Sequence, residues 1–309
     1  MNLTPEEIGV RMDALGLWNL LEPYNFALKP KGTVFPYFCT VLKGDRKPVK
    51  VRFLMLEGWQ TLHDFVHVRF DRNYGFYQSP IEMPHLELVV FETGEAKLFR
   101  HDTGYVPQEA VAAHRELGAR LLWEAYGVMM RVETDRGLPM RFAESKAVFA
   151  RVETAPDVWE DRPLVIPDPP PHIEKVTFPK ADLKAAQDLP VVRDEVLDVD
   201  FRLLPNIVTK EPRPRCVYEL QAIDPKTGER VESSRTSIHP ELGIRGIWES
   251  VPVQLLKVLI RRGRVPGEIR TCSGRMFRML RPLCQEFQFK LSLHDKLQSM
   301  EAGFGIIQP

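Results

Sequence analysis

Residues 195–224 read EVLDVDFRLLPNIVTKEPRPRCVYELQAID, and this stretch decides the fold class of the C-terminal part of the chain. Its two apolar runs are rich in β-branched and aromatic residues, which is typical of strands. The segments that follow are a strand, a helix, a strand, a helix and a strand, at TGERVESSRTS (227–237), 244–263, EIRTC (268–272), FRMLRPLCQEF (277–287) and FKLSL (289–293). Three consecutive strands followed by alternating helices and strands predict an α/β domain with a five-stranded mixed sheet.

The N-terminal part has the pattern of an α+β domain, which we place at residues 1–152. Thr4-Pro5-Glu6-Glu7 is a helix start, with a cap residue, a proline at the first helical position and a glutamate three residues after the cap. Apolar segments at 34–42 and 49–56 flank the turn sequence GDRKP, and residues 85–100 contain a second pair around Thr93-Gly94. A long helix is expected within 107–133. These hairpins predict an antiparallel sheet.

A change in composition separates the two parts. Between Glu153 and Asp200 there are eight prolines, and twelve acidic residues face five basic ones. Proline fixes φ and removes an amide donor, so such a segment suits an extended connection better than a sheet interior. We therefore expect a proline-rich acidic linker over residues 153–193, with a short helix around ADLKAAQD (181–188), and a C-terminal domain over 194–309.

Composition and charge narrow the class of protein. The 309 residues are 44% apolar and 27% charged with a formal net charge of zero, so no overall field attracts nucleic acid or an anionic membrane. Apolar runs such as LLKVLI are far shorter than the roughly 20 residues of a membrane helix, so we expect no membrane partner. The four cysteines form no C-x-x-C pair and MNLTPEEIGV has no apolar signal core, which favours a cytoplasmic protein with free thiols.

Residues 195–293 resemble the ribonuclease H-like catalytic core of retroviral-type integrases and transposases. VLDVDFRLLPN is similar to the first strand of that core, which ends in its first metal-binding aspartate, and Asp200 stands at that position. AIDPKTGERV resembles the second and third strands with their turn. RGRVPGEIRTCSGRMF resembles the stretch that holds the second aspartate, where this chain has Cys272. The whole chain is also similar to bacterial two-domain proteins of unknown function that pair an α+β domain with such a core.

The resemblance implies a chemistry that this chain supports only in part. In that family two divalent ions held by three carboxylates activate a nucleophile for phosphodiester chemistry. The soft sulfur of Cys272 is a poor ligand for Mg²⁺, which prefers oxygen. The third acid has no motif match in HDKLQSMEAGFGIIQP (294–309), although Asp295 and Glu301 lie there. We therefore expect no cofactor, with Mg²⁺ or Mn²⁺ implied only if the chain is a nuclease.

Each candidate for catalysis has a structural alternative. Asp200 is either a metal ligand or a polar residue at the end of an acid-rich strand. Asp224 begins Asp-Pro-Lys-Thr-Gly, a turn sequence in which the carboxylate accepts amides of the next residues. Cys272 is either a reactive thiol or a small buried apolar residue, which is the more common use of a free cysteine.

A weaker metal candidate lies in TLHDFVHVRFD (61–71). His63 and His67 are four residues apart, a spacing that places two imidazoles on one face of a helix and allows them to share a metal ion. The same segment alternates as a strand would. The alternative is that both histidines are packing or surface residues.

The strongest functional hint is a basic stretch near the C-terminus. Between Val251 and Gln285 eight basic residues face the single acid Glu268; they are Lys257, Arg261, Arg262, Arg264, Arg270, Arg275, Arg278 and Arg281. Phosphate backbones favour such clusters through counterion release, and the last three recur at helical spacing and are expected to line one groove. The alternatives are a solvated face, or docking on the acidic segment 153–200.

Three functions follow from these patterns. The leading hypothesis is a non-catalytic ribonuclease H-like module that binds a nucleic acid or protein partner through residues 257–281. The alternative is a metal-dependent phosphodiester hydrolase that uses Asp200. The third is a thiol or zinc enzyme built on Cys272 or on His63 and His67.

Overall fold

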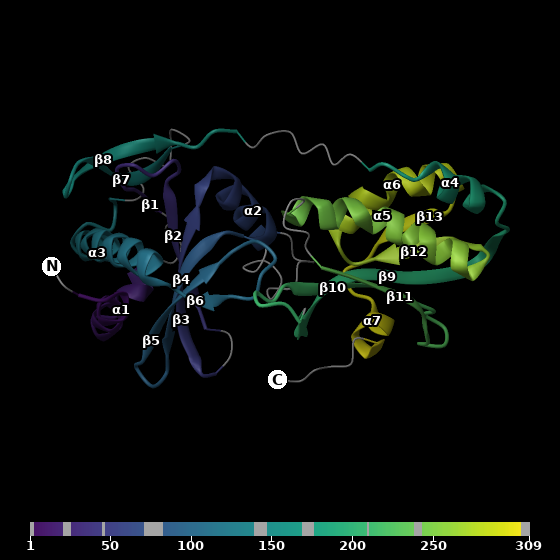
Figure 1. Cartoon of the computed structure of the whole chain (residues 1–309), viewed down its shortest axis with the longest axis horizontal. Helices are drawn as coiled ribbons and strands as arrows, with labels where there is room; N and C mark the ends of the chain where they lie inside the picture. Colours follow the sequence, from purple (N-terminus) through teal and green to yellow (C-terminus); the bar gives the residue numbers. More distant parts are fainter. Residues whose placement is uncertain are drawn as a thin grey trace. The chain divides into compact units, whose positions relative to one another are not determined.

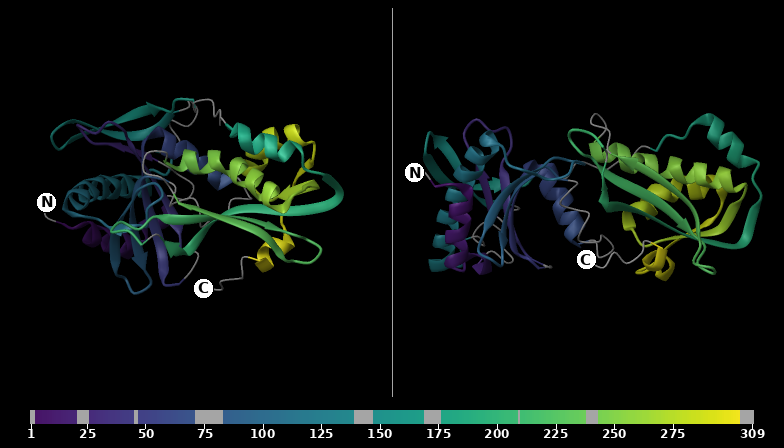
Figure 2. Two further views of the ribbon diagram at one scale, coloured as in Figure 1. Left: turned by 45° about the vertical axis from the view of Figure 1, so that its right-hand side comes forward. Right: turned by 60° about the horizontal axis from the view of Figure 1, so that its bottom comes forward.

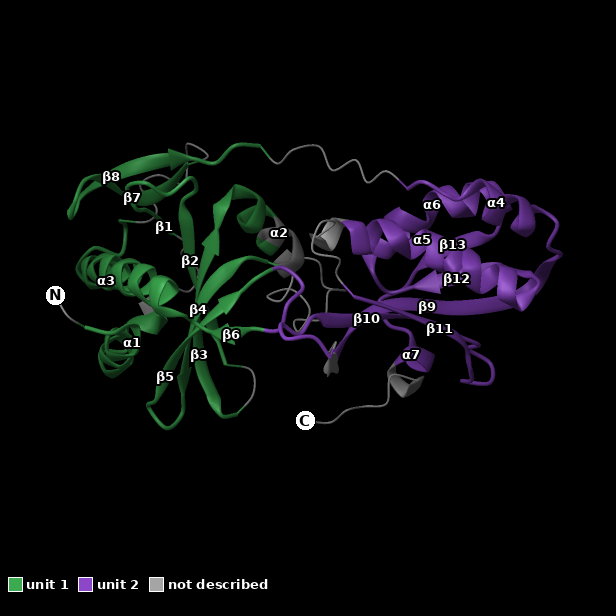
Figure 3. Cartoon of the chain, in the orientation of Figure 1, with its two compact units in different colours: residues 1–67, 83–102, 107–171 green, residues 68–82, 103–106, 172–309 purple. Residues whose placement is uncertain are grey.

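The structure, a computed structural model, divides into two compact units (Figures 1 and 3). It describes residues 3–20, 26–44, 47–70, 83–138, 147–168, 176–208, 210–237 and 243–303; within these, the side chains of 20, 64, 66–70, 205–208, 243–245 and 301–303 are left aside. Unit 1 comprises Met1–His67, Met83–Asp102 and Pro107–Pro171, and unit 2 comprises Val68–Glu82, Thr103–Val106 and His172–Pro309.

An eight-stranded sheet forms the framework of unit 1, counted over the described residues, in the order β6-β5-β4-β3-β2-β1-β7-β8. The strands are β1 (Phe26–Lys29), β2 (Tyr37–Lys43), β3 (Val49–Glu57), β4 (His85–Phe91), β5 (Ala96–His101), β6 (Gln108–Glu109), β7 (Ala147–Ala155) and β8 (Val158–Val165). The two predicted hairpins are confirmed as β2–β3 and β4–β5. The prediction of an antiparallel sheet was wrong in one respect, because β7 pairs with β1 in parallel and the sheet is mixed.

Helices α1 (Pro5–Ala14) and α3 (Ala112–Thr134) cover one face of this sheet, and η1 (Leu17–Leu20) follows α1. The predicted start of α1 is present, since the Thr4 side chain accepts from the Glu7 amide and Glu7 accepts from the Thr4 amide. Each helix approaches the sheet closely at a glycine. A Cβ on Gly9 would lie 2.5 Å from Leu88, and one on Gly118 would lie 2.6 Å from Leu98.

The opposite face of the sheet carries helix α2 (Gly58–Phe70). Side chains on a strand alternate between faces, so Phe38 and its partner Leu56 point away from the α1 and α3 side, where Tyr37 and Cys39 join the main core. Trp59 of α2 packs on Phe38 with ring centroids 4.8 Å apart. This face also carries His85 and Glu87.

The expected linker over 153–193 contains regular structure over much of its length. Residues 147–165 form the β7–β8 hairpin, and β9 begins at Val191. Proline does not prevent this pairing because β8, which contains Pro163, is an edge strand and is mostly exposed. The expected short helix is present as α4 (Lys180–Gln187).

Unit 2 contains the predicted five-stranded mixed sheet, in the order β11-β10-β9-β12-β13. Its strands are β9 (Val191–Val208), β10 (Cys216–Ile223), β11 (Arg230–Ser237), β12 (Val265–Thr271) and β13 (Lys290–Leu293). The first three in sequence are antiparallel neighbours, whereas β12 runs parallel to β9 and to β13.

Helices cover the two faces of this sheet unequally (Figures 1 and 2). Helices α4, α5 (Gly243–Arg262) and α6 (Gly274–Phe287) pack over one face, where Leu197, Val199 and Phe201 meet Trp248 and Leu255. The short α7 (Gln298–Gly303) lies against β9 and β10 on the other face. Within the described residues, none of the helices combines the length and apolar character needed to cross a membrane.

Unit 2 also includes Thr103–Val106, a segment from the N-terminal part of the sequence. Gly104 accepts a hydrogen bond from the Cys216 amide at 2.9 Å, and the Val106 amide donates to Pro214 at 3.1 Å. The Arg213 guanidinium lies 4.1 Å from the centre of the Tyr105 ring. The segment therefore extends the structure at the start of β10.

Candidate functional site

The face of the unit 2 sheet opposite α5 and α6 carries polar side chains, and we call it the polar face. Its central members alternate with the core residues of β9, β10 and β12 and include Asp198, Asp200, Arg202, Glu219, Gln221, Glu268, Arg270 and Cys272. Residue exposure is 3% for Asp198 and Asp200, 2% for Glu219 and 1% for Gln221. Buried polar groups at this density must satisfy one another.

Asp200 and Cys272 meet on this face. Asp200 lies in the middle of β9 and Cys272 follows the last residue of the parallel neighbour β12. The Cys272 thiol donates to Asp200 Oδ2 over 3.5 Å, and the Phe201 amide donates to Oδ1 over 2.9 Å. The parallel pairing of β9 and β12 is sufficient to bring these two positions together.

Arg202 was missed by the sequence analysis and completes this cluster. Its guanidinium donates to Asp200 Oδ2, and its Nη2 atom lies 3.9 Å from Cys272 Sγ. Burial lowers the pKa of Arg202, but Asp200 and Cys272 favour the charged form and the net shift is upward. A fixed cation thus stands beside the carboxylate where a metal-dependent enzyme would need an ion.

The thiol of Cys272 remains protonated over the physiological range. Burial first, and the Asp200 carboxylate second, raise its pKa to about 12, although Arg202 opposes this. A reactive cysteine needs the opposite, an environment that stabilises the thiolate. The geometry therefore favours a hydrogen-bonded structural thiol over a nucleophile.

Asp198 is a second buried carboxylate on the polar face that the sequence analysis did not select. Ser299 of α7 donates to its Oδ2 atom, and Oδ1 has no hydrogen-bond partner among the described residues. Asp198 pairs in register with Arg270 of β12. The alternation in DVD was the available signal, because residues i and i+2 of a strand share a face.

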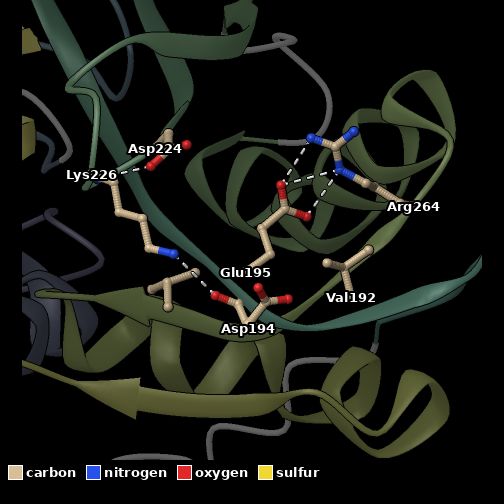
Figure 4. Close-up of a pocket in the computed structure, with 7 residues that line it drawn as sticks. Val192, Asp194, Glu195, Asp224, Lys226 and Arg264 are labelled. Atoms are coloured by element: carbon tan, nitrogen blue, oxygen red, sulfur yellow. Dashed lines mark hydrogen bonds and ion pairs between the residues drawn. The ribbon is translucent and has the colours of Figure 1, made fainter.

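Asp224 is separate from this cluster and has the turn role that its sequence suggests. It follows β10, and its Oδ1 atom accepts from the Lys226 amide at 2.8 Å. Gly228 supplies the positive φ of 72° that the turn requires. Asp224, Asp194, Glu195, Lys226 and Arg264 line a hollow of about 360 Å³ (Figure 4).

Acidic residues pair with at least four members of the predicted basic stretch. Glu195 lies 2.6 Å from Arg262 and 3.0 Å from Arg264. Arg261 pairs with Glu232 at 3.2 Å and Arg270 with Glu268 at 3.5 Å. Burial raises the pKa of Glu195, but its arginine partners lower this pKa by a larger amount. The net shift is downward, so Glu195 stays ionised. Glu195 belongs to β9 and lies outside the expected linker 153–193, so these ion pairs do not test whether the basic stretch docks on that linker.

The remaining basic residues are spread over two helices. Lys257 of α5 and Arg278 and Arg281 of α6 are exposed. Arg275 lies over Trp248, with its guanidinium carbon 4.3 Å from the ring centre. Arg275, Arg278 and Arg281 all belong to α6, as their helical spacing predicts, whereas Arg270 belongs to the polar face on the other side of the sheet.

The histidine pair of the sequence analysis falls on helix α2, so the helical alternative for this segment is the one formed. His63 Nε2 lies 3.0 Å from the Pro167 carbonyl oxygen. The His67 side chain lies outside the described residues. A different set of three potential metal ligands was missed: His85, Glu87 and His101 in unit 1, whose donor atoms all lie within 4.8 Å of one another.

Comparison with known proteins identifies one related family model. Residues 182–305 match a family described as a domain of unknown function (DUF6930). The match begins within α4 and ends after α7, so it covers the sheet and helices of unit 2. No curated protein and no solved structure matches the chain.

Proposed function

We propose that unit 2 is a ribonuclease H-like binding module that does not catalyse phosphodiester chemistry. Its strand order and directions support this, because three antiparallel strands followed by two parallel ones are what the sequence resemblance implies. The family match over 182–305 is consistent with a unit that folds around this sheet. A fold of this kind persists without its metal, since the helices and sheet bury the core.

One observation carries the proposal: the guanidinium of Arg202 pairs with Asp200 beside the sulfur of Cys272. A two-metal site needs several carboxylates free to coordinate the ions. Here the matching carboxylate is neutralised by a side chain two residues away, and the second position offers a protonated thiol. Both changes favour a stable polar cluster and oppose binding of Mg²⁺.

The charges favour a protein partner over nucleic acid. Binding to a phosphate backbone gains from releasing counterions, which requires clustered basic groups. In unit 2, Arg261, Arg262, Arg264 and Arg270 are in ion pairs, and the exposed Lys257, Arg278 and Arg281 are divided between two helices. Protein surfaces accept such mixed and dispersed charge.

The test measures both partner classes with the full chain. In gel-shift titrations with single- and double-stranded DNA and RNA at 50 and 200 mM salt, we expect no tight binding with a steep salt dependence. Affinity capture with the tagged chain should retain a partner at both salt concentrations. Nucleic-acid binding that weakens about 1,000-fold between these concentrations, and is lost in the double variant Arg278→Glu and Arg281→Glu, would contradict the protein assignment.

A metal-dependent phosphodiester hydrolase is the second candidate. The observation that favours it is the pair of buried carboxylates Asp198 and Asp200, because Asp198 Oδ1 has no hydrogen-bond partner among the described residues. Nuclease assays with Mn²⁺ and Mg²⁺ should compare the parent with Asp200→Ala, using Asp224→Ala as the matched control in a turn. The binding-module proposal predicts no activity in any of them. Activity lost in Asp200→Ala alone would establish the hydrolase instead.

A further inference from the structure

Unit 1 contains a cluster of histidine and glutamate side chains that is independent of the proposed function of unit 2. His85 and Glu87 alternate on β4, and His101 ends β5. His85 lies directly opposite His101 in the antiparallel register. The three side chains therefore share one face of the sheet, the face that carries α2.

This cluster is buried and its histidine nitrogens are not all used by the protein. Exposure is 0% for His85, 3% for Glu87 and 4% for His101. The two imidazole rings stack with centroids 4.0 Å apart. His85 Nε2 and His101 Nδ1 have no hydrogen-bond partner within the described structure. Such buried polar atoms are rare and call for an explanation.

The hydrogen bond of His85 fixes which nitrogen carries its proton. Nδ1 lies 2.7 Å from the backbone oxygen of Met83. A carbonyl oxygen only accepts, so Nδ1 is the protonated nitrogen and Nε2 presents a lone pair to the cluster. Imidazoles that bind metal ions are held in the same way, with the other nitrogen donating to a carbonyl or carboxylate.

Glu87 supplies a negative charge at the same place. Arg52 donates to Oε1, and Oε2 lies 2.5 Å from His101 Nε2. Burial raises the pKa of Glu87, but these partners outweigh it and the net shift is downward. Arg52 uses one carboxylate oxygen and leaves the other facing the histidines.

We propose that His85, Glu87 and His101 form a binding site for Zn²⁺ or a closely similar transition-metal ion. Two imidazoles and one carboxylate are a known ligand set for zinc, and nitrogen donors select such ions over Mg²⁺ and Ca²⁺. The donor atoms lie within 4.8 Å of one another. Metal–ligand distances of about 2.0–2.2 Å in a tetrahedral site place donors roughly 3.4 Å apart, so the donor atoms have to move by about 1 Å and the stacked imidazole rings have to rotate until their lone pairs point at one ion.

A purely structural hydrogen-bonded cluster is the competing explanation. It accounts for the contact between Glu87 and His101. A purely structural cluster leaves His85 Nε2 and His101 Nδ1 without hydrogen-bond partners in the core. A metal ion would be bound directly by His85 Nε2. A bound ion would tie β4 to β5 and so stabilise unit 1.

The first experiment uses the full-length parent protein and the metal alone. Protein stripped with a chelator is titrated with Zn²⁺ by calorimetry and with Co²⁺ by visible absorption. We expect one ion per chain, tetrahedral Co²⁺ bands that Zn²⁺ displaces, and a higher thermal unfolding midpoint with Zn²⁺. Absence of stoichiometric binding in these titrations would overturn the proposal.

The second experiment assigns the ligands. His85→Gln and Glu87→Gln each remove a donor while keeping similar volume, and His114→Gln, a half-buried histidine of α3, is the matched control. Since loss of an outer partner alone weakens metal sites 10–100-fold, loss of a ligand should weaken binding about 100-fold or more. Equal affinity in all three variants would overturn the site. If the two ligand variants do not fold by circular dichroism, X-ray absorption spectroscopy of the zinc-loaded parent decides: two imidazole ligands per ion are expected, and an ion held by cysteine sulfur would overturn the site.

Discussion

Water reaches the two partners of the Asp200–Arg202 ion pair to different extents. The Asp200 side chain is 5% exposed and that of Arg202 is 31% exposed. Removing the arginine therefore leaves a nearly buried carboxylate without its cation, and loss of one partner in such a pair costs more than the pair contributes to stability. The cost is reduced here because the guanidinium side is open to solvent.

Arg202→Met is expected to lower the free energy of unfolding by about 2–3 kcal/mol. Urea denaturation followed by circular dichroism measures the change. Arg202→Lys is the control, since it keeps the charge and should lose less. The double variant Asp200→Asn and Arg202→Met should recover part of the loss because no charge remains unpaired. Equal stability of the parent and Arg202→Met would show that the pair is solvated.

Cys272 is expected to resist alkylating and disulfide reagents at pH 8 in the folded protein. Its pKa is raised to about 12 by burial and by Asp200, so the thiolate that reacts is scarce. Because the folded state favours the protonated thiol, Cys272 contributes to the free energy of unfolding. This contribution is fully present below the ordinary pKa of 9.0 and is lost as pH rises toward 12. Mass spectrometry after timed iodoacetamide treatment, with and without denaturant, checks this. Rapid labelling of native Cys272 at pH 8 would contradict it.

The sequence pointed to Asp200 and Cys272, which are in contact, but not to Arg202, which pairs with Asp200. Asp200 and Cys272 were placed by resemblance, and parallel strands bring them together. Arg202 was missed because strand alternation shows that it shares a face with Asp200 but not whether its flexible side chain turns toward it. His85, Glu87 and His101 were missed because their proximity depends on the register between β4 and β5, which periodicity does not specify.

Strand β12 illustrates how an element tolerates residues that usually break strands. It begins at Val265, before Pro266 and Gly267, whereas the sequence placed its start at 268. The register with β9 shifts between Pro266 and Glu268. At Gly267 an added Cβ would lie 2.2 Å from the Arg193 carbonyl oxygen, so the two backbones approach too closely for any side chain.

Gly267→Ala is expected to destabilise the protein by about 2 kcal/mol or more, because the backbone of β9 has to move. Gly127→Ala is the matched control: this glycine lies in α3 with no atom within 4 Å of an added Cβ. It should stabilise by about 0.5–1 kcal/mol, since glycine is unfavourable inside helices. Urea denaturation midpoints check both signs, and a neutral Gly267→Ala would mean that β9 and β12 separate easily.

The elements with strong periodicity were predicted well, and the short or edge elements were not. The long helix and both hairpins of unit 1 and the five strands of unit 2 are present near their expected positions. Strands β1 and β6 have four and two residues, too few to establish alternation. Strand β8 is exposed on both faces, so it lacks the apolar pattern that reveals a strand.

For the whole molecule, acidic side chains of unit 2 make stability dependent on pH. Burial raises the pKa of Glu195 and Glu219, but their hydrogen-bonded partners lower it by more than burial raises it, so the net shift is downward. The hydrogen bond from Ser292 lowers the pKa of Glu268. Folded-state values below the ordinary 4.5 mean that the stabilisation is present above that pH and is lost as pH falls through the lowered values.

The urea midpoint is therefore expected to decline as pH falls below about 6.5, because burial lowers the pKa of His85 to about 3 and only the unfolded chain takes up that proton, and to decline more steeply below about pH 4.5 as the carboxylates titrate. Glu219→Gln should be less stable than the parent at pH 7 but show a shallower decline, since one of the titrating groups is gone. Fluorescence of the buried Trp248 and the other tryptophans reports the transition. A midpoint that is constant down to pH 3 would show that these carboxylates are paired equally in the unfolded chain.

The division into two parts was expected from composition, but the path of the chain between them was not. Unit 2 takes Thr103–Val106 from the N-terminal part of the sequence, and its Tyr105 pairs with Arg215. No compositional boundary marks four residues. Likewise, the parallel pairing of β1 with β7 joins positions more than a hundred residues apart, and local patterns carry no information about such pairs.

The contribution of Thr103–Val106 to unit 2 restricts how the two parts of this gene recombine. A single exchange at the codons near residue 171 would transfer unit 2 to a new neighbour without the backbone that caps the start of β10. A recipient would have to supply an equivalent tetrapeptide of its own. Inheritance of both parts together keeps Thr103–Val106 paired with the start of β10.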